Sequence, residues 1–313
     1  MEAIGGYFSL ELPFREEYHK DAIKLNTGRN CLEYILRARG YKKVYIPYYT
    51  CEVILEPINK LGISYEFYYI DINLEIRDCF TLKEEEALLY TNYFGLKQRY
   101  VEQLAEKLGN HLIVDNTQAF YAKPIQGIDT FYTCRKFFGV ADGAYLYAEK
   151  LLDEDFAQDV SYDRMEHLLK RIDLSAEEGY ADFRRADDGL DNQPIKRMSK
   201  LTQRIMLSID YEAAAMKRRE NYLKLHEVLG EENNLQLTLD EDAVPMAYPF
   251  LTPIQGLREK LIENKVFVAR YWPNVLEWTT KDDIEYLLAN QMQPLPIDQR
   301  YGEEMKYIIK IVT

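Results

Sequence analysis

Two side chains that could act together on one small molecule follow neighbouring apolar segments in the middle of the chain. Asp115 ends the stretch HLIVD (111–115), and Lys136 comes shortly after the next stretch, DTFYT (129–133). A lysine amine can hold an aldehyde as a Schiff base, and a carboxylate can keep a pyridine nitrogen protonated so that the ring accepts electrons. A carboxylate and a lysine placed in this order are the pair that pyridoxal phosphate (PLP) chemistry requires.

A separate segment near the N-terminus is suited to binding a phosphate. The run TGRN (27–30) opens a predicted helix, where free backbone N–H groups and the helix dipole favour an anion. Gly28 permits close approach of a ligand to the backbone, and Arg29 adds a positive charge. The start of this helix is therefore a candidate phosphate site.

Helices and strands are predicted to alternate from Thr27 onward. Strands are predicted at 43–46, 64–70, 87–91, 112–114 and 144–147, and helices at 27–40, 53–61 and 98–108. Strands separated by helices imply βαβ units and a mostly parallel sheet, whose ligands lie at the carboxyl ends of the strands. We therefore expect one sheet edge to collect Tyr48, Tyr49, Thr50, Tyr93, Asp115 and the loop of Lys136.

The pattern predicts three regions along the chain: an N-terminal arm (1–25), a large α/β domain (26–205), and a long helix with a small α+β domain (206–313). The stretch 151–195 is acidic and weakly patterned, and an interrupted helix is expected over 198–229. Shorter elements are expected at 244–251, 256–264, 266–271 and 307–312.

Composition narrows the class of protein. The net charge of −13 over 313 residues argues against a nucleic-acid or anionic-membrane protein. Basic residues nevertheless cluster at 135–136, 196–197 and 217–219, so an anionic substrate stays possible. The four cysteines are scattered without a C-x-x-C spacing, so no metal site is expected. No signal peptide or apolar run of membrane length is recognisable, and we expect a cytoplasmic protein.

These motifs resemble those of the PLP-dependent sugar aminotransferases of the DegT/DnrJ/EryC1/StrS group, over about residues 26–312. The family patterns S-G-T-A-A-L, P-x-x-T-aromatic and D-x-A-Q correspond to TGRNCL (27–32), PYYTC (47–51) and DNTQ (115–118). The serine-then-lysine element, the R-M-S helix start and the closing Leu-Pro segment correspond to TCRK (133–136), RMS (197–199) and LPI (295–297). The resemblance implies a three-layer α/β/α type I PLP-transferase fold with a mostly parallel sheet, plus a smaller C-terminal α+β domain.

Site residues follow from the resemblance position by position. Lys136 would form the Schiff base, Asp115 would pair with the pyridinium nitrogen, and Gln118 would lie near the 3-oxygen of the cofactor. The phosphate would be held by Arg29, Asn30 and Thr133. The remaining expected cofactor neighbours are Gly28, Tyr49, Thr50, Cys51 and Arg197. Cys51 stands where many members have a ring-stacking aromatic residue, so the resemblance leaves two alternatives: Tyr49 takes that role, or the stacking is weak.

The resemblance also implies an activity. An amino acid, with glutamate as the expected donor, would give its amino group to a keto-sugar, expected to be nucleotide-linked, in surface polysaccharide or related biosynthesis. Lys136 would move the proton between the donor and the cofactor, a step that typically contributes about 10²–10⁴-fold. The clusters at 196–197 and 217–219 could meet a diphosphate, although a solvated helix face also explains them. A homodimer is expected, because type I sites are built at the subunit interface.

Other functions stay open on the sequence. A PLP-dependent lyase or sugar dehydratase would use the same fold, but the related dehydratases replace the lysine by histidine, and Lys136 speaks against that version. Cysteine desulfuration is disfavoured because Cys51 and Cys134 lie inside structural motifs. A non-catalytic or regulatory protein that keeps the fold is favoured by the unusual phosphate loop and the missing stacking ring.

Overall fold

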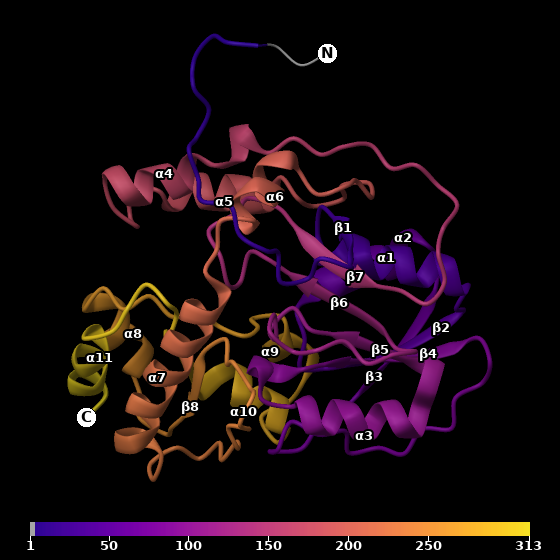
Figure 1. The fold of residues 1–313 in the computed structure, drawn as a ribbon. Coiled ribbons are helices and arrows are strands. Elements are labelled where there is room, and N and C mark those ends of the chain that lie inside the picture. Colours follow the sequence, from indigo (N-terminus) through magenta and orange to yellow (C-terminus); the bar gives the residue numbers. More distant parts are fainter. Residues whose placement is uncertain (1–3) are drawn as a thin grey trace.

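One seven-stranded sheet organises the larger part of the molecule (Figure 1). The computed structural model describes residues 4–313, so the first three residues of the predicted arm lie outside the described residues. The strand order is β1-β7-β6-β5-β4-β2-β3, and the five strands from β6 to β3 in that order run parallel. Only β7 runs against its neighbours. The predicted mostly parallel α/β sheet is therefore confirmed.

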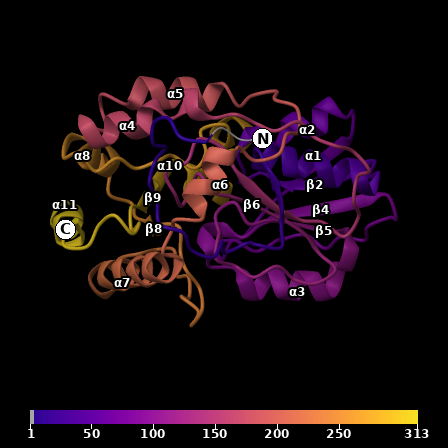
Figure 2. The same cartoon turned by 45° about the horizontal axis from the view of Figure 1, so that its top comes forward.

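The strands are β1 (Ile23–Leu25), β2 (Lys43–Pro47), β3 (Ser64–Tyr68), β4 (Glu86–Thr91), β5 (Leu112–Asp115), β6 (Asp129–Thr133) and β7 (Ala144–Tyr147). Alternate residues of the central strands enter two different cores. Leu89 and Ile113 pack in the core that includes α1 (Gly28–Arg39) and α2 (Leu55–Lys60). Leu88 and Leu112 pack in the core that includes α3 (Gln98–Leu108). Helices on both faces give the three layers seen in Figures 1 and 2.

The region after β7 differs from its predicted irregular structure. Two helices, α4 (Glu166–Asp173) and α5 (Tyr180–Asp188), form within the stretch 151–195. Helix α4 buries none of its residues, and its apolar Ile172 is exposed. Leu168, Leu169 and Ile172 nevertheless have the spacing of one helix face, so a helical pattern was present in the sequence and was missed among the charged residues around it.

The long helix predicted over 198–229 is interrupted, as expected. It consists of α6 (Lys200–Met206) and α7 (Tyr211–Leu229). The break lies at 207–210, where the Asp210 side chain accepts a hydrogen bond from the Ala213 N–H and caps α7. The cap makes Asp210 the start of a new helix instead of part of a continuous one.

The C-terminal part forms a small α+β unit around a two-stranded antiparallel sheet. Its elements are β8 (Tyr248–Leu251), α8 (Leu257–Glu263), α9 (Val275–Trp278), α10 (Ile284–Gln291), β9 (Met292–Leu295) and α11 (Glu304–Val312). No helix or strand forms over 266–271, contrary to the sequence pattern. Val266 and Val268 are buried in irregular chain, so their apolar character reflects core packing without strand pairing.

The N-terminal arm is joined to the sheet at its end. Strand β1 pairs antiparallel with β7, so the last three residues of the predicted arm belong to the sheet. Glu17 and His19 just before it are buried, whereas the exposed residues 4–10 run out from the body of the molecule (Figure 1). Within residues 4–313 there is no helix whose length and hydrophobicity would allow it to span a membrane.

Candidate active site

The loop that carries Lys136 is held at both ends. It leaves the carboxyl end of β6, and the Cys134 carbonyl accepts hydrogen bonds from the N–H groups of Phe137 (3.1 Å) and Phe138 (2.9 Å). The Cys134 N–H in turn donates to the Gly143 carbonyl at 3.0 Å. Gly143 has φ +109°, and a Cβ there would lie 2.8 Å from Thr202 Cγ2. This position therefore requires glycine.

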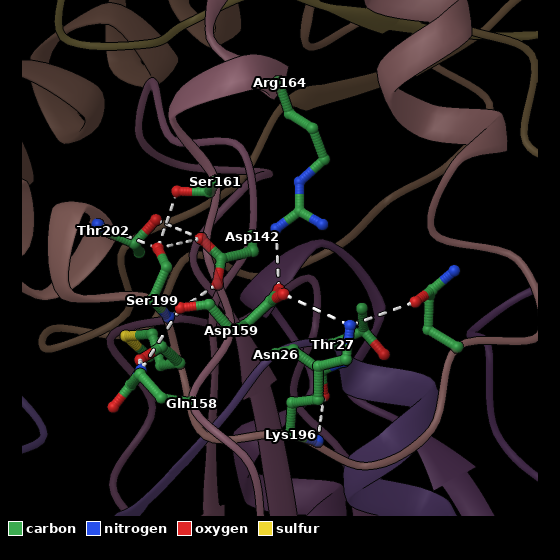
Figure 3. A network of polar contacts seen from close by, with 12 residues as sticks. Asn26, Thr27, Asp142, Gln158, Asp159, Ser161, Arg164, Lys196, Ser199 and Thr202 are labelled. Carbon is green, nitrogen blue, oxygen red and sulfur yellow. Dashed lines mark hydrogen bonds and ion pairs between the residues drawn. The ribbon is translucent and has the colours of Figure 1, made fainter.

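Asp142 ties the far end of the same loop to α6 (Figure 3). Its fully buried carboxylate accepts hydrogen bonds from the Ser199 N–H (2.8 Å) and the Ser199 hydroxyl (2.7 Å). The Thr202 hydroxyl donates to it as well. Ser199 Oγ also accepts from the Thr202 N–H and so caps α6. The lysine loop and the start of α6 thus share one polar network.

The Lys136 amine lies beside Asp115 and Cys51. Its Nζ donates to Thr117 Oγ1 at 3.0 Å. Part of the side chain is accessible to solvent, but the surrounding protein partly desolvates the amine, and this lowers the pKa of Lys136. The negative charge of Asp115 raises this pKa, and the positive charge of Arg135 lowers it further. The fraction of the neutral amine, which is the nucleophilic form, is therefore larger than for an ordinary lysine.

Asp115 ends β5 and is almost completely buried, with 7% of its surface exposed. Its Oδ1 accepts the Thr117 N–H at 2.8 Å. Burial raises the pKa of Asp115, while the charge of Lys136 and the hydrogen bonds from Thr117 act in the opposite direction. Thr117 is thus bonded to both members of the pair. Its role was not predicted from the sequence, where its position inside the DNTQ motif was the only signal.

Among the residues predicted to contact the cofactor, two have a buried hydrogen-bonding group without a partner in the described chain: the Gln118 side-chain amide nitrogen and the Tyr49 hydroxyl. Gln118 Oε1 accepts the Phe94 N–H at 2.8 Å, which fixes the orientation of the amide. A buried polar group without a partner costs about 1–3 kcal/mol. A ligand that hydrogen-bonds to these groups would remove that cost.

The start of α1 lies against Thr117. A Cβ at Gly28 would come within 3.3 Å of Thr117 Cγ2, so the glycine permits this close approach. Thr27 caps the helix by accepting the Asn30 N–H. The first N–H groups of a helix have no partner within the helix, and they favour an anion. The structure therefore brings the TGRN segment next to Asp115 and Lys136.

Several side chains assigned to the cofactor by resemblance are occupied by protein groups. Arg29 forms ion pairs with Glu56 (2.7 Å) and Asp191 (2.5 Å). The Asn30 amide donates to the Gln193 carbonyl, and its oxygen accepts the Thr27 hydroxyl. The charge of Arg29 is thus already compensated, so a phosphate at this helix start would rely mainly on backbone N–H groups.

The other predicted residues lie in two places. Thr50 and Cys51 follow β2, and the Thr50 carbonyl accepts a hydrogen bond from the Asn274 amide of the small domain. Thr133 ends β6, next to the lysine loop. Arg197 is separated from them: it pairs with Asp155 at 3.6 Å and lines a different hollow, beside β1. One copy of the chain therefore does not bring Arg197 to Lys136.

A cavity of about 750 Å³ opens beside Lys136. Its walls come from the lysine loop, the α4–α5 region and the small domain. Six basic side chains line it: Arg135, Lys136, Arg171, Arg218, Arg258 and Arg300. In the described chain, two of these six side chains, Arg135 and Arg300, have a carboxylate within 4.0 Å, and the other four have none. The cavity is thus positively charged in a protein of net charge −13, which suits an anionic ligand.

The sequence matches no protein-family model, and a search of curated proteins gives no match. Solved structures match over nearly the whole chain. A DegT DnrJ EryC1 StrS aminotransferase from Brucella abortus has a TM-score of 0.60 and 13% identity, covering 94% of this chain and 88% of its own.

Two further structures show the same likeness. DesV from S. venezuelae, determined in complex with a ketimine intermediate, has a TM-score of 0.63 and 16% identity, covering 93% of this chain and 83% of its own. GDP-4-keto-6-deoxymannose-3-dehydratase with bound GDP-perosamine has a TM-score of 0.64 and 13% identity, covering 96% and 93%. The chain therefore has the fold of PLP-dependent aminotransferases of the DegT/DnrJ/EryC1/StrS type, with which this dehydratase shares it.

Proposed function

We propose that the protein is a PLP-dependent aminotransferase that moves an amino group from an amino acid, with glutamate as donor, to a keto-sugar linked to a nucleotide. The observation that carries the proposal is the Lys136 amine, whose pKa is lowered, next to the buried carboxylate of Asp115. Both lie where strands of a parallel sheet end, which is where ligands bind in such sheets. The shared fold supports the same chemistry.

The residues fit the cofactor in four respects. Lys136 supplies the amine for its aldehyde, Asp115 a buried acceptor for its ring nitrogen, and Gln118 an unpartnered donor for its oxygen. The start of α1 beside Gly28 supplies N–H groups for its phosphate. When bound, PLP would supply an electron sink for the carbanion formed at the donor α-carbon.

The chain's own residues account for the proton transfer. Lys136 is the base within reach of the site, and its lowered pKa increases the fraction of neutral amine that can accept a proton at neutral pH. Asp115 places a carboxyl group in a buried position, and in its charged form this group would stabilise a protonated ring nitrogen. Thr117 bonds to both and holds their relative position.

The charged cavity supports an anionic acceptor. Arg171 and Arg258 line it without a carboxylate partner in the described chain, and Phe137 and Phe183 add aromatic surface. A nucleotide-linked sugar carries both a diphosphate and a ring system that suit such walls. The dehydratase of similar fold was determined with GDP-perosamine, which is a ligand of this class.

We also propose a homodimer. Leu169, Ile172 and Leu174 in the α4 region are more than half exposed, at 56%, 81% and 64%. Neighbouring exposed apolar side chains favour a protein interface, and a second copy would cover them. Light scattering of the purified protein checks this assignment, and a monomer that still turned over substrate would contradict it.

The assignment of Lys136 has a direct spectroscopic test. Wild-type protein mixed with PLP is expected to develop a visible absorbance because Lys136 binds the aldehyde, and glutamate is expected to bleach it because its amino group passes to the cofactor as 2-oxoglutarate is released. Lys136→Ala is expected to show neither the band nor any transamination. Lys123→Ala, which removes an exposed lysine elsewhere, serves as the matched control. A normal band or turnover in Lys136→Ala would end the assignment.

A dehydratase is the second candidate, because one of the similar structures has that activity in its description. Product analysis separates the two reactions. An aminotransferase converts glutamate to its keto acid in proportion to aminated sugar, whereas a dehydratase removes water from the sugar and incorporates no nitrogen.

A further inference from the structure

Arg218 of α7 is a buried cation in direct contact with the lysine loop. Only 1% of its surface is exposed, and no carboxylate of the described residues lies within 4.0 Å of it. Burial lowers the pKa of this guanidinium to about 10. A buried charge without a paired carboxylate is costly. The hydrogen bonds of Arg218 must therefore stabilise it.

Arg218 Nη1 donates to the carbonyls of residues 245–246 (3.5 and 3.1 Å), and its other contacts lie at the residue after Lys136. Arg218 Nη2 donates to the Phe137 carbonyl at 3.3 Å, and the guanidinium lies 4.5 Å from the centroid of the Phe137 ring. Gln299 Nε2 donates to the same carbonyl at 2.9 Å. Arg218 Nε donates to Gln299 Oε1 at 2.9 Å and closes the triangle. Both lone pairs of the Phe137 carbonyl are therefore occupied.

The same face of α7 holds the loop that carries Gln299. Asn221, one helical turn after Arg218, is fully buried, and its amide donates to the carbonyls of Ile297 (3.2 Å), Asp298 (3.3 Å) and Tyr301 (2.9 Å). Residues three apart on a helix lie on one face. Helix α7 therefore positions Gln299 through Asn221 and the lysine loop through Arg218.

Lys136 is thus held from two sides. The large domain holds its loop through the Cys134 carbonyl, which accepts the N–H groups of Phe137 and Phe138. From the side of the small domain, Arg218 and Gln299 donate hydrogen bonds to the carbonyl of Phe137, the residue after Lys136. Reacting groups displaced by about 1 Å can lose about 100-fold in rate, so a fixed backbone on both sides of the lysine matters for proton transfer.

We propose that Arg218, acting with Gln299, is a positioning residue that fixes the backbone next to Lys136 from the small-domain side. The inference rests on the proposed function, because it assigns a catalytic consequence only if Lys136 is the reactive amine. Arg218 itself does not act on the substrate. Its effect comes from the geometry of its hydrogen bonds and not from its charge alone.

The test compares Arg218→Met with Arg219→Met. Arg219 is the next residue of α7 and donates to the Asp240 and Ala243 carbonyls, away from the lysine loop. Arg218→Met is expected to slow bleaching by saturating glutamate about 10- to 100-fold, with less than about a threefold change in KM. Arg219→Met is expected to stay within about twofold of the wild type.

A second measurement does not depend on the cofactor. Hydrogen exchange of the Phe137 and Phe138 amides, in protein without added PLP, is expected to quicken about tenfold or more in Arg218→Met and in Gln299→Met, but not in Arg219→Met. Gln299 is partly exposed, so Gln299→Met supplies the result if Arg218→Met fails to fold.

Arg218→Lys separates geometry from charge. Lysine keeps the positive charge but lacks the planar fork that reaches Gln299 and Phe137 together, so a large rate defect is expected to remain. Wild-type rates in Arg218→Lys, or unchanged exchange in both Arg218→Met and Gln299→Met, would overturn the inference. Absence of a PLP band in the wild type would instead refute the proposed function, and the exchange result would still stand.

Discussion

The pairing of Lys136 with Asp115 makes each side chain dependent on the other. Desolvation lowers the pKa of the amine and raises that of the carboxyl, so both charged forms are disfavoured. Their mutual attraction acts in the opposite direction in both cases. Arg135 has the same charge as the ammonium form of Lys136 and therefore lowers the pKa of Lys136, against the effect of Asp115. The pKa of the Lys136 amine therefore depends on one negatively charged and one positively charged neighbour.

Two substitutions are expected to move the pKa of Lys136 in opposite directions. Asp115→Asn removes the charge that stabilises the ammonium form, so the pKa of Lys136 is expected to fall. Arg135→Gln removes a repelling charge, so the pKa is expected to rise. The pH dependence of Lys136 acetylation, followed by peptide mass spectrometry on protein without cofactor, measures both. Shifts of the same sign in the two variants would contradict this account.

At the scale of elements, the active-site loop depends on a helix cap that is distant in sequence. Ser199 caps α6 and at the same time supplies two of the hydrogen bonds to Asp142, which ends the loop of Lys136 (Figure 3). Ser161 Oγ lies 2.7 Å from Ser199 Oγ and extends the network. Two residues before Ser161, Asp159 pairs with two cations, Arg164 at 2.7 Å and Lys196 at 3.5 Å. A substitution at the cap of α6 is therefore expected to disturb the loop that carries Lys136.

Ser199→Ala is expected to destabilise the protein by about 3 kcal/mol. Loss of a helix cap costs about 0.5–2 kcal/mol, and a buried carboxylate deprived of a donor costs about 1–3 kcal/mol. Urea unfolding measures the change. Ser175→Ala removes a simple cap of the Glu178 N–H outside this network, and its loss is expected to stay near or below about 1 kcal/mol. Equal losses in both variants would show that Asp142 does not depend on Ser199.

On the scale of the whole molecule, the N-terminal arm is part of the structure that supports the site. His19 is buried with 1% exposure; its Nε2 donates to the Phe120 carbonyl at 2.7 Å, and Nδ1 lies 3.2 Å from the Tyr147 hydroxyl. Phe120 follows the DNTQ motif, and Tyr147 ends β7. The arm thus packs against the back of the segments that carry Asp115 and Lys136.

The free energy of unfolding is expected to decrease at acidic pH because His19 is buried. Burial lowers the pKa of His19 from 6.5 to about 4, so between these pH values the unfolded chain binds a proton that the folded chain does not. The contribution is fully present above pH 6.5 and is lost as the pH falls toward 4. It corresponds to at most about 3 kcal/mol.

Urea midpoints at pH 7.5 and 4.5 check this prediction by comparing the wild type with His19→Gln. Glutamine can keep a donor for the Phe120 carbonyl but does not titrate, so the variant is expected to lose less stability between the two pH values. Carboxylates that titrate in the same range affect both proteins alike. An identical loss in the two proteins would show that His19 does not contribute.

The sequence by itself determined the order of elements in the sheet-forming part of the chain and predicted the central pair. Apolar runs such as LIVD, bounded by helices with clear amphipathic periodicity, specify parallel strands, because this information is local. Asp115 and Lys136 follow two such strands, and neighbouring parallel strands place their carboxyl ends on one edge. The resemblance named the fold, which the likeness to solved structures confirms.

Only the tertiary structure decided which side chains are free to meet a ligand. The ion pairs of Arg29, the separation of Arg197 from the cavity and the burial of Arg218 all depend on contacts between residues far apart in the chain. Helices α4 and α5 were not predicted because the stretch that contains them is rich in charged residues, although α4 has apolar residues at helical spacing. Sequence periodicity records which face of an element is buried, but it does not record the partner that covers it.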